Sequence, residues 1–247
     1  AGARVYFIEA RDVPILDVQL DFAAGNGYAA PGKAGLPGLT RSLLEAGAGD
    51  LNEEQLAERL TDTGARLSGG VDNDRASVAL RTLSAKPERE AALALMRTVL
   101  SAPTFPQAVL TREKERSIAA IREADTQPGA ISAKRFAAAI YPDHPYGVSA
   151  TAESVAAITR QDLVNFYQQH YAAKNATVSL IGDISRSEAE AIADQLSQAL
   201  PAGGVLATLP PVTLPARQII KVAHPATQSH VHIGLPAVRR GDADYFA

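Results

Sequence analysis

The stretch GLPGLTRSLLEAGAGD, residues 35–50, predicts a short amphipathic helix at a place where an enzyme could carry its catalyst. A proline lies in its first turn, Gly47 follows its last turn, and its leucines recur at the spacing of one helix face: Leu36, Leu39, Leu43 and Leu44. The polar side carries Gly38, Arg41 and Ser42, where a hydrolase would place His, Glu or Asp. The helix signal is therefore good, and the chemical signal is missing.

The composition is that of an ordinary globular protein of 247 residues, with 46% hydrophobic and 21% charged residues. A formal net charge of -3 with interspersed signs provides no basic field for nucleic acid or anionic lipid, so we expect neither partner. The absence of cysteine excludes disulfides, thiolate zinc sites and a cysteine nucleophile, and it leaves the redox compartment open.

No targeting or membrane segment stands out in the sequence. No run approaches the roughly 18 apolar residues of a membrane helix, and the first residues are neither Met nor a basic and apolar leader. We therefore expect no membrane span and a chain start that has been processed or trimmed.

Strand and helix signals alternate along the first 200 residues. Residues 4–25 alternate apolar and polar side chains on both sides of Arg11, which predicts two strands with a turn near Pro14. A helix ending at Gly64 and two strands around VDNDR, residues 71–75, follow. Proline-bounded helices, a short buried strand in NATVSLIGD and a final capped helix complete this unit.

A proline-rich stretch marks a domain boundary. Residues 201–216, PAGGVLATLPPVTLPA, have no helical period and the composition of a linker, so residues 1–210 form the predicted first domain. Beyond it, RQIIKVAH and SHVHIGLP predict two more strands, and GDADYFA resembles the start of a helix. A lone hairpin is marginal in water, so we expect residues 217–247 to begin a second, truncated domain that further chain completes.

This order of elements resembles the pitrilysin or insulinase-type zinc metallopeptidases, the superfamily of mitochondrial processing peptidase. The most specific pieces are GLPGLTRSLLEAG, EEQLAERLTDTGARLSGGVDND, REKERSIAAIREADTQP, DHPYG and YAAKNATVSLIGD, and the match covers nearly the whole chain. The resemblance implies an α+β domain with a mixed, mostly antiparallel sheet packed by helices, followed by the start of a second similar domain.

The same resemblance locates the positions of a zinc site. Active members carry an inverted motif, His-x-x-Glu-His, in which the histidines bind zinc and the glutamate activates water. The matching positions here are Gly38, Arg41 and Ser42. The third ligand, a glutamate roughly 77 residues beyond the second histidine, falls on Ala119. Since these residues offer one weak oxygen and a cation, we expect no zinc, no other cofactor and no catalysis in this chain.

The same three helix positions also have a plain structural interpretation. They can form an ordinary solvated helix face, with Arg41 pairing Glu45 four residues later, and we favour this over any chemical role. In QSHVHIG, His230 and His232 share one strand face and could form a metal pair, but no third ligand lies at useful spacing.

Two other histidines are predicted to be structural. His144 lies in the DHPYG turn, and His170 lies near a helix end, where a partly charged imidazole favours the helix dipole.

Three other motifs are incomplete in this sequence. VDNDR lacks the glycine and the bidentate glutamate of a calcium loop, so a turn between strands is favoured. The sequence has no Gly-x-Ser-x-Gly elbow, and GLPG is not followed by the Lys-Ser or Lys-Thr of a phosphate-binding loop. Serine hydrolases and nucleotide enzymes are therefore not supported.

The predicted function is that of a non-catalytic subunit in a two-chain zinc metallopeptidase. The resemblance implies a catalytic His-x-x-Glu-His partner, a cavity closed by this chain, and a peptide substrate that can add as a strand along ARLSGGVDND. Two alternatives stay open: a purely structural subunit like the core proteins of respiratory complexes, and a metallopeptidase with an unrecognised site such as His230 and His232. Related paired bacterial chains are commonly exported, so we expect the periplasm.

Overall fold

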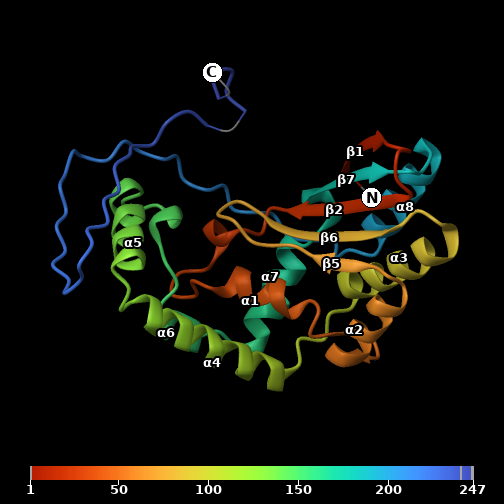
Figure 1. Ribbon diagram of the computed structural model, residues 1–247, viewed down its shortest axis with the longest axis horizontal. Helices are drawn as coiled ribbons and strands as arrows, with labels where there is room; N and C mark the ends of the chain where they lie inside the picture. Colours follow the sequence, from red (N-terminus) through yellow and green to blue (C-terminus); the bar gives the residue numbers. More distant parts are fainter. Residues whose placement is uncertain (1, 240, 246–247) are drawn as a thin grey trace.

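A mixed sheet forms the centre of the computed structural model, which describes residues 2–239 and 241–245 (Figure 1). Five strands pair in the order β1-β7-β2-β6-β5. Their bounds are Arg4–Glu9 (β1), Ile15–Phe22 (β2), Arg66–Ser68 (β5), Ala76–Leu83 (β6) and Ala176–Gly182 (β7). Only β1 and β7 run parallel, and the other pairs are antiparallel, so the predicted α+β class with a mostly antiparallel sheet is confirmed.

One face of this sheet is buried because apolar residues alternate along its strands. In β2 the side chains that face the helices are all almost inaccessible: Leu16, Val18, Leu20 and Phe22. The residues between them, such as Asp17 and Gln19, face the other side, where Asp17 pairs with Arg81 of β6. Period-two alternation therefore identifies the core face, as expected for a half-buried strand.

The first two strands are not neighbours. Strand β7 lies between β1 and β2, parallel to the former and antiparallel to the latter, although the chain between them is short. Leu180 of β7 pairs with Phe7 on one side and Val18 on the other. The strand between β1 and β2 thus comes from a distant part of the chain, which no local pattern indicates.

Helices cover the apolar face and extend away from it. Their bounds are Leu36–Leu43 (α1), Glu53–Asp62 (α2), Lys86–Ser101 (α3), Gln107–Ala124 (α4), Pro128–Ile140 (α5), Ala152–Ala156 (α6), Arg160–His170 (α7) and Arg186–Gln198 (α8). Capping boxes begin four of them, at Asn52, Thr151, Thr159 and Ser185. Helix α1 packs against α4, α7 and β6, which places it at the centre of the helical layer. No helix in the described ranges is both long and apolar enough to cross a bilayer.

Short elements complete the chain and connect these layers. A two-stranded ribbon joins Gly47–Ala48 (β3) to Leu51–Asn52 (β4), so Gly47 lies beyond the end of α1, as predicted. Three 3-10 turns span Asn26–Tyr28 (η1), Pro145–Gly147 (η2) and Ala173–Asn175 (η3).

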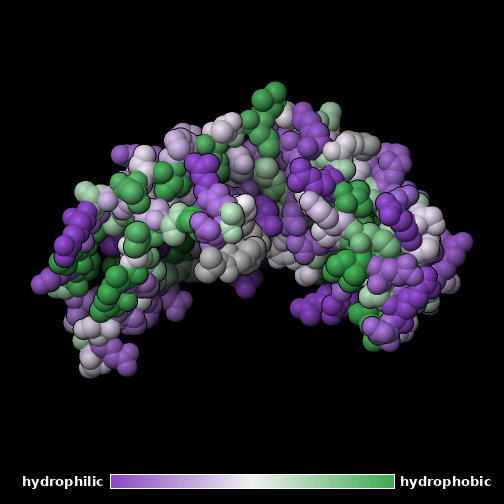
Figure 2. Space-filling view, turned by 90° about the horizontal axis from the view of Figure 1, so that it is seen from above, coloured by the Kyte–Doolittle hydropathy of each residue, from purple (hydrophilic) through white to green (hydrophobic). Residues whose placement is uncertain are grey.

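The segment beyond residue 200 differs from the prediction. Neither RQIIKVAH nor SHVHIGLP forms a strand, and both run as exposed extended chain past α5 (Figure 1). Residues 241–245 form turns and a bend. The predicted strands are wrong for this structure because neither segment pairs with another strand among the described residues. Figure 2 shows the resulting crescent, with a hollow between the lobe that holds α5 and this segment and the lobe that holds the sheet. The last two residues of the predicted helix start lie outside the described residues.

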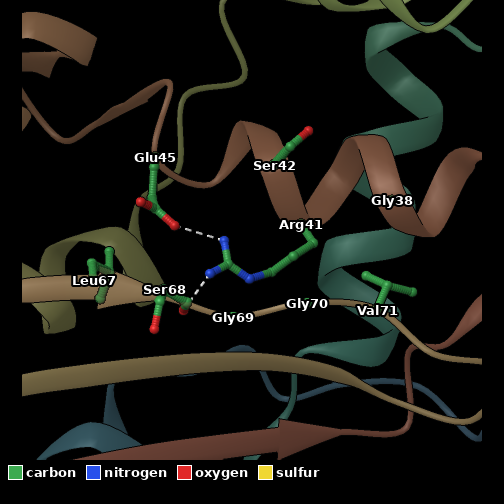
Figure 3. A pocket seen from close by; sticks show the side chains of 9 residues that line it. All are labelled: Gly38, Arg41, Ser42, Glu45, Leu67, Ser68, Gly69, Gly70 and Val71. Carbon is green, nitrogen blue, oxygen red and sulfur yellow. Dashed lines mark hydrogen bonds and ion pairs between the residues drawn. The ribbon is translucent and has the colours of Figure 1, made fainter. Parts of the chain in front are cut away.

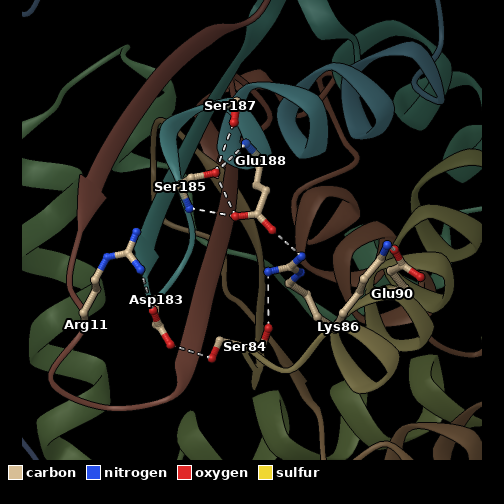
Figure 4. A network of polar contacts seen from close by, with 9 residues as sticks. Arg11, Ser84, Lys86, Glu90, Asp183, Ser185, Ser187 and Glu188 are labelled. Atoms are coloured by element: carbon tan, nitrogen blue, oxygen red, sulfur yellow. Dashed lines mark hydrogen bonds and ion pairs between the residues drawn. The ribbon is translucent and has the colours of Figure 1, made fainter.

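A polar network joins α8 to α3 at one end of the sheet (Figure 4). Glu188 accepts from the backbone and the hydroxyl of Ser185, both at 2.8 Å, and from Arg89 at 2.7 Å. The guanidinium of Arg89 is nearly buried and also donates to the Ser84 carbonyl. These bonds, the Ser185 backbone first, lower the pKa of Glu188 to about 2.

This network predicts an acid-dependent loss of stability. Because the pKa of Glu188 falls from 4.5 to about 2 on folding, its contribution is complete above pH 4.5 and disappears as the pH falls towards 2. Glu188→Gln should remove about 1 kcal/mol at neutral pH, a value reduced for the solvent screening of a half-exposed carboxylate. Urea unfolding between pH 2 and 7 measures it, with Glu90→Gln in the exposed Lys86 pair as control. Parallel pH profiles for Glu188→Gln and the unsubstituted protein would contradict this assignment.

Candidate functional site

A shallow pocket lies between α1 and the end of β5 (Figure 3). Its volume is about 350 Å³, and it is lined by Gly38, Arg41, Ser42, Glu45, Leu67, Ser68, Gly69, Gly70 and Val71. The space beside Gly38 and Gly70 is open, because a Cβ placed at either residue would meet no atom within 4 Å. The three predicted α1 positions therefore converge on one cavity.

Arg41 crosses the floor of this pocket from the helix to the sheet. Its Nε donates to the carbonyl of Ser77 at 2.6 Å, one Nη donates to Ser68 O at 2.5 Å, and the other donates to the carboxylate of Glu45 at 2.7 Å. Figure 3 shows the guanidinium pointing from α1 towards the strand, between Glu45 and Ser68. Its side chain is only 7% exposed, so the cation is buried, and each of its three nitrogens donates to an acceptor.

The sheet edge is shaped to receive this cation. In a regular ladder Gly70 N would donate to Ser77 O, but here it donates to the Ser77 hydroxyl at 3.0 Å, which leaves the carbonyl for Arg41. Gly69 has φ +149, and a Cβ there would lie 2.0 Å from Ser77 O and 2.6 Å from Arg41 Nη. Sequence reasoning missed the role of these residues, although the glycine pair in ARLSGG was a signal of close backbone approach.

The prediction of a solvated helix face is therefore wrong for Arg41 and correct for Gly38 and Ser42. The expected pair with Glu45 is present, but Arg41 is buried against the sheet because its donors reach the carbonyls of Ser68 and Ser77. Ser42 is exposed, points away from the strand in Figure 3, and donates to Leu39 O at 3.1 Å. Gly38 is exposed as well.

The fourth position does not line this pocket. Ala119 lies on an exposed part of α4, and α4 packs against α1, but no α4 residue is among those that line the cavity. Nowhere in residues 2–239 and 241–245 do three His, Cys, Asp or Glu side chains gather so that they could hold a metal ion.

The histidines singled out above make structural contacts. His170 is buried, its Nδ1 lies 2.8 Å from Ala23 O, and its ring stacks on Phe166 with centroids 4.2 Å apart. Burial lowers its pKa, so the partly charged imidazole expected at this helix end is wrong. His230 and His232 lie against α5, where His232 contacts the ring of Phe136 at 5.3 Å.

The VDNDR segment is a turn, as predicted. Asp72 Oδ1 accepts from the backbone of Asp74 at 2.7 Å and of Arg75 at 2.6 Å, which closes the connection between β5 and β6. Val71 at its start lines the pocket. The turn thus forms one end of the candidate site.

One family profile matches the chain. It is described as the inactive domain of peptidase M16 and covers residues 157–247. Among curated proteins, an uncharacterised zinc protease of Rickettsia bellii is 21% identical over 188 residues, which are 75% of this chain and 45% of that protein.

Solved structures share the fold. The chain is similar to a peptidase M16 inactive domain from Pseudomonas fluorescens, with 37% identity, a TM-score of 0.83, and coverage of 87% of this chain and 52% of that one. It is also similar in fold to the periplasmic protease PqqL from Escherichia coli, with 17% identity, a TM-score of 0.73, and coverage of 86% and 24%. The chain therefore spans about half or less of the length of these proteins.

The buried cation predicts a large cost for its removal. Arg41→Ala should lower the free energy of unfolding by about 2 to 4 kcal/mol, because it removes three hydrogen bonds of a buried cation and leaves the Ser77 carbonyl and Glu45 without this donor. Arg81→Ala is the matched control, since Arg81 makes a similar pair with Asp17 but is 64% exposed, and it should cost about 0.5 kcal/mol. Urea denaturation with unchanged m-values measures both. Equal losses in the two variants would mean that Arg41 does not hold the helix to the sheet.

Proposed function

Because this chain belongs to the pitrilysin-type, or M16, peptidase superfamily, we propose that it acts as the non-catalytic subunit of a two-chain zinc metallopeptidase. In this role it binds peptide and encloses it, while a partner chain with the His-x-x-Glu-His motif holds zinc and cleaves. The observation that carries the proposal is the buried guanidinium of Arg41 where active members have their catalytic base.

Arg41 is unsuited to act as a metal ligand or as the general base of metal-assisted hydrolysis. A guanidinium does not deprotonate at physiological pH, so it cannot act as a general base, and its positive charge repels a dication. Its donors are also occupied by Ser68, Ser77 and Glu45. The chemistry available at this pocket is therefore binding and positioning, not cleavage.

The sheet edge beside the pocket supports a role in peptide binding. Strand β5 is the last strand of the sheet. Ser77 N donates to Gly70 O and Asp72 N to Arg75 O, so the ladder alternation turns the backbone groups of Leu67 and Gly69 towards the open edge. A peptide in extended conformation can pair with such groups, with the open space at Gly70 above it.

The proposed compartment is the periplasm. The similar protease from Escherichia coli is described as periplasmic, and the lack of cysteine is compatible with an oxidising environment. Fractionation of the native protein with cytosolic markers would contradict this location.

Reconstitution tests the division of labour. The full-length protein that contains this chain should have no peptidase activity and no stoichiometric zinc alone, and it should co-purify with a His-x-x-Glu-His chain from the same cells and raise the activity of that chain. A Glu→Gln change in the partner's motif should abolish the activity of the mixture, which locates catalysis there. Zinc with activity in this protein alone would refute the proposal, and a stable assembly without any peptidase partner would favour a structural subunit.

A graft tests the proposed correspondence of the four degenerate positions. Gly38→His alone should bind no more zinc than the parent, because one imidazole does not hold the metal. Together with Arg41→Glu, Ser42→His and Ala119→Glu it should take up measurable zinc, since the α1 positions share one helix face. Calorimetric titration measures the zinc uptake of both variants, and circular dichroism shows whether each is folded. A folded fourfold variant that gains no zinc uptake would mean that these four positions do not converge and that the proposed correspondence is wrong.

A further inference from the structure

The proline-rich linker is docked against the first domain at two points. At the first, Gly204 N donates to Gln169 O at 3.3 Å and Lys174 donates to Gly203 O at 3.1 Å. At the second, Pro210 O lies 2.9 Å from Nε2 of His144, and the side chain of Leu209 packs against Gly27. The composition predicted a linker, and residues 201–210 follow the surface of the domain as a strap.

The second anchor depends on one buried imidazole in one tautomer. His144 is 5% exposed, and its Nδ1 accepts from Tyr146 N at 3.1 Å. Since a proline carbonyl can only accept, Nε2 carries the proton and donates to Pro210. The ring is held between Tyr141 and Tyr146, with centroid distances of 6.0 and 4.4 Å.

The same residues continue to the end of the pocket. The hydroxyl of Tyr146 donates to Asp74 in the turn between β5 and β6. Burial, followed by the contact with Asp74, raises the pKa of Tyr146, so the hydroxyl keeps its proton as the donor. The turn is also held by Gly25 N and Gly27 N, which donate to Asp74 O and Asn73 O at 3.2 and 2.8 Å. A Cβ on Gly25 would lie 2.4 Å from the Asp74 backbone, so the two loops touch directly.

We infer that His144 is a positioning residue that couples the seating of the linker at Pro210 to the order of the β5–β6 turn beside the pocket. Pro210, His144, Tyr146 and Asp74 form an unbroken series of contacts between the two. When the linker leaves, His144 loses its acceptor and its cover, and Tyr146 and the turn lose the support of a fixed ring. The seating of the linker can in this way change how well ordered the β5–β6 turn and the adjacent sheet edge are.

Three variants separate the parts of this series. His144→Phe keeps the ring volume and removes both hydrogen bonds, His144→Gln retains a side-chain donor and acceptor, and Tyr146→Phe removes only the bond to Asp74. The measurements are limited proteolysis within residues 203–216 and hydrogen exchange of the amides in residues 70–77, both on the full-length protein. Exchange of the amides of β2, the central strand of the sheet, reports whether the protein remains folded.

For His144→Phe we expect linker cleavage and exchange in residues 70–77 to rise together by about tenfold, with β2 unchanged. In His144→Gln both linker cleavage and exchange in residues 70–77 should lie much closer to those of the unsubstituted protein. Tyr146→Phe should raise exchange in the turn without increasing linker cleavage. Faster linker cleavage in His144→Phe with unchanged exchange in residues 70–77 would overturn the coupling. If His144→Phe does not fold, Leu209→Ala releases the linker from its other contact and must produce the same paired rise; a rise in cleavage alone would again overturn it.

Discussion

The guanidinium of Arg41 is the interaction on which the candidate site depends. It joins α1 to β5 and β6 by donating to two strand carbonyls, and Glu45 on its own helix balances its charge. A cation of this size is tolerated inside a protein only when its donors are satisfied, and here each nitrogen has an acceptor. The spacing between helix and sheet, and therefore the pocket, follows from the length of this side chain.

The same interaction explains what the pocket lacks. On the proposed correspondence of α1 with the inverted zinc motif, Arg41 stands at the position of the base, and Gly38 and Ser42 stand at those of the two histidines. Here a positive charge fills the floor, and its bonds to the strand stabilise the fold. An open strand edge and two glycines remain above it, and these are features of a surface that holds an extended chain.

The C-terminal part of the chain shows how a segment can be both docked and without regular structure. The strap of residues 201–210 is held by the carbonyl of Gln169 and the side chains of Lys174 and His144, and the extended chain beyond it follows α5. The family profile begins at residue 157 and continues through this part, so the matched region includes α7, β7, α8 and the whole linker.

The sequence by itself determined those features that depend on neighbouring residues. Helix α2 begins at Asn52 and ends before Gly64 because a side-chain cap and a left-handed glycine act within one turn. The turn at Asp72 and the core face of β2 could likewise be predicted from residue types and spacing.

Only the tertiary structure decided what depends on residues far apart in the chain. The insertion of β7 between β1 and β2 is a long-range pairing, and the burial of Arg41 requires carbonyls that lie 27 and 36 residues away. Residues 229–236 have the alternation of a strand but no strand beside them, so they remain extended chain. A side chain or strand takes its final environment from its partners, and local sequence cannot specify which distant groups will reach it.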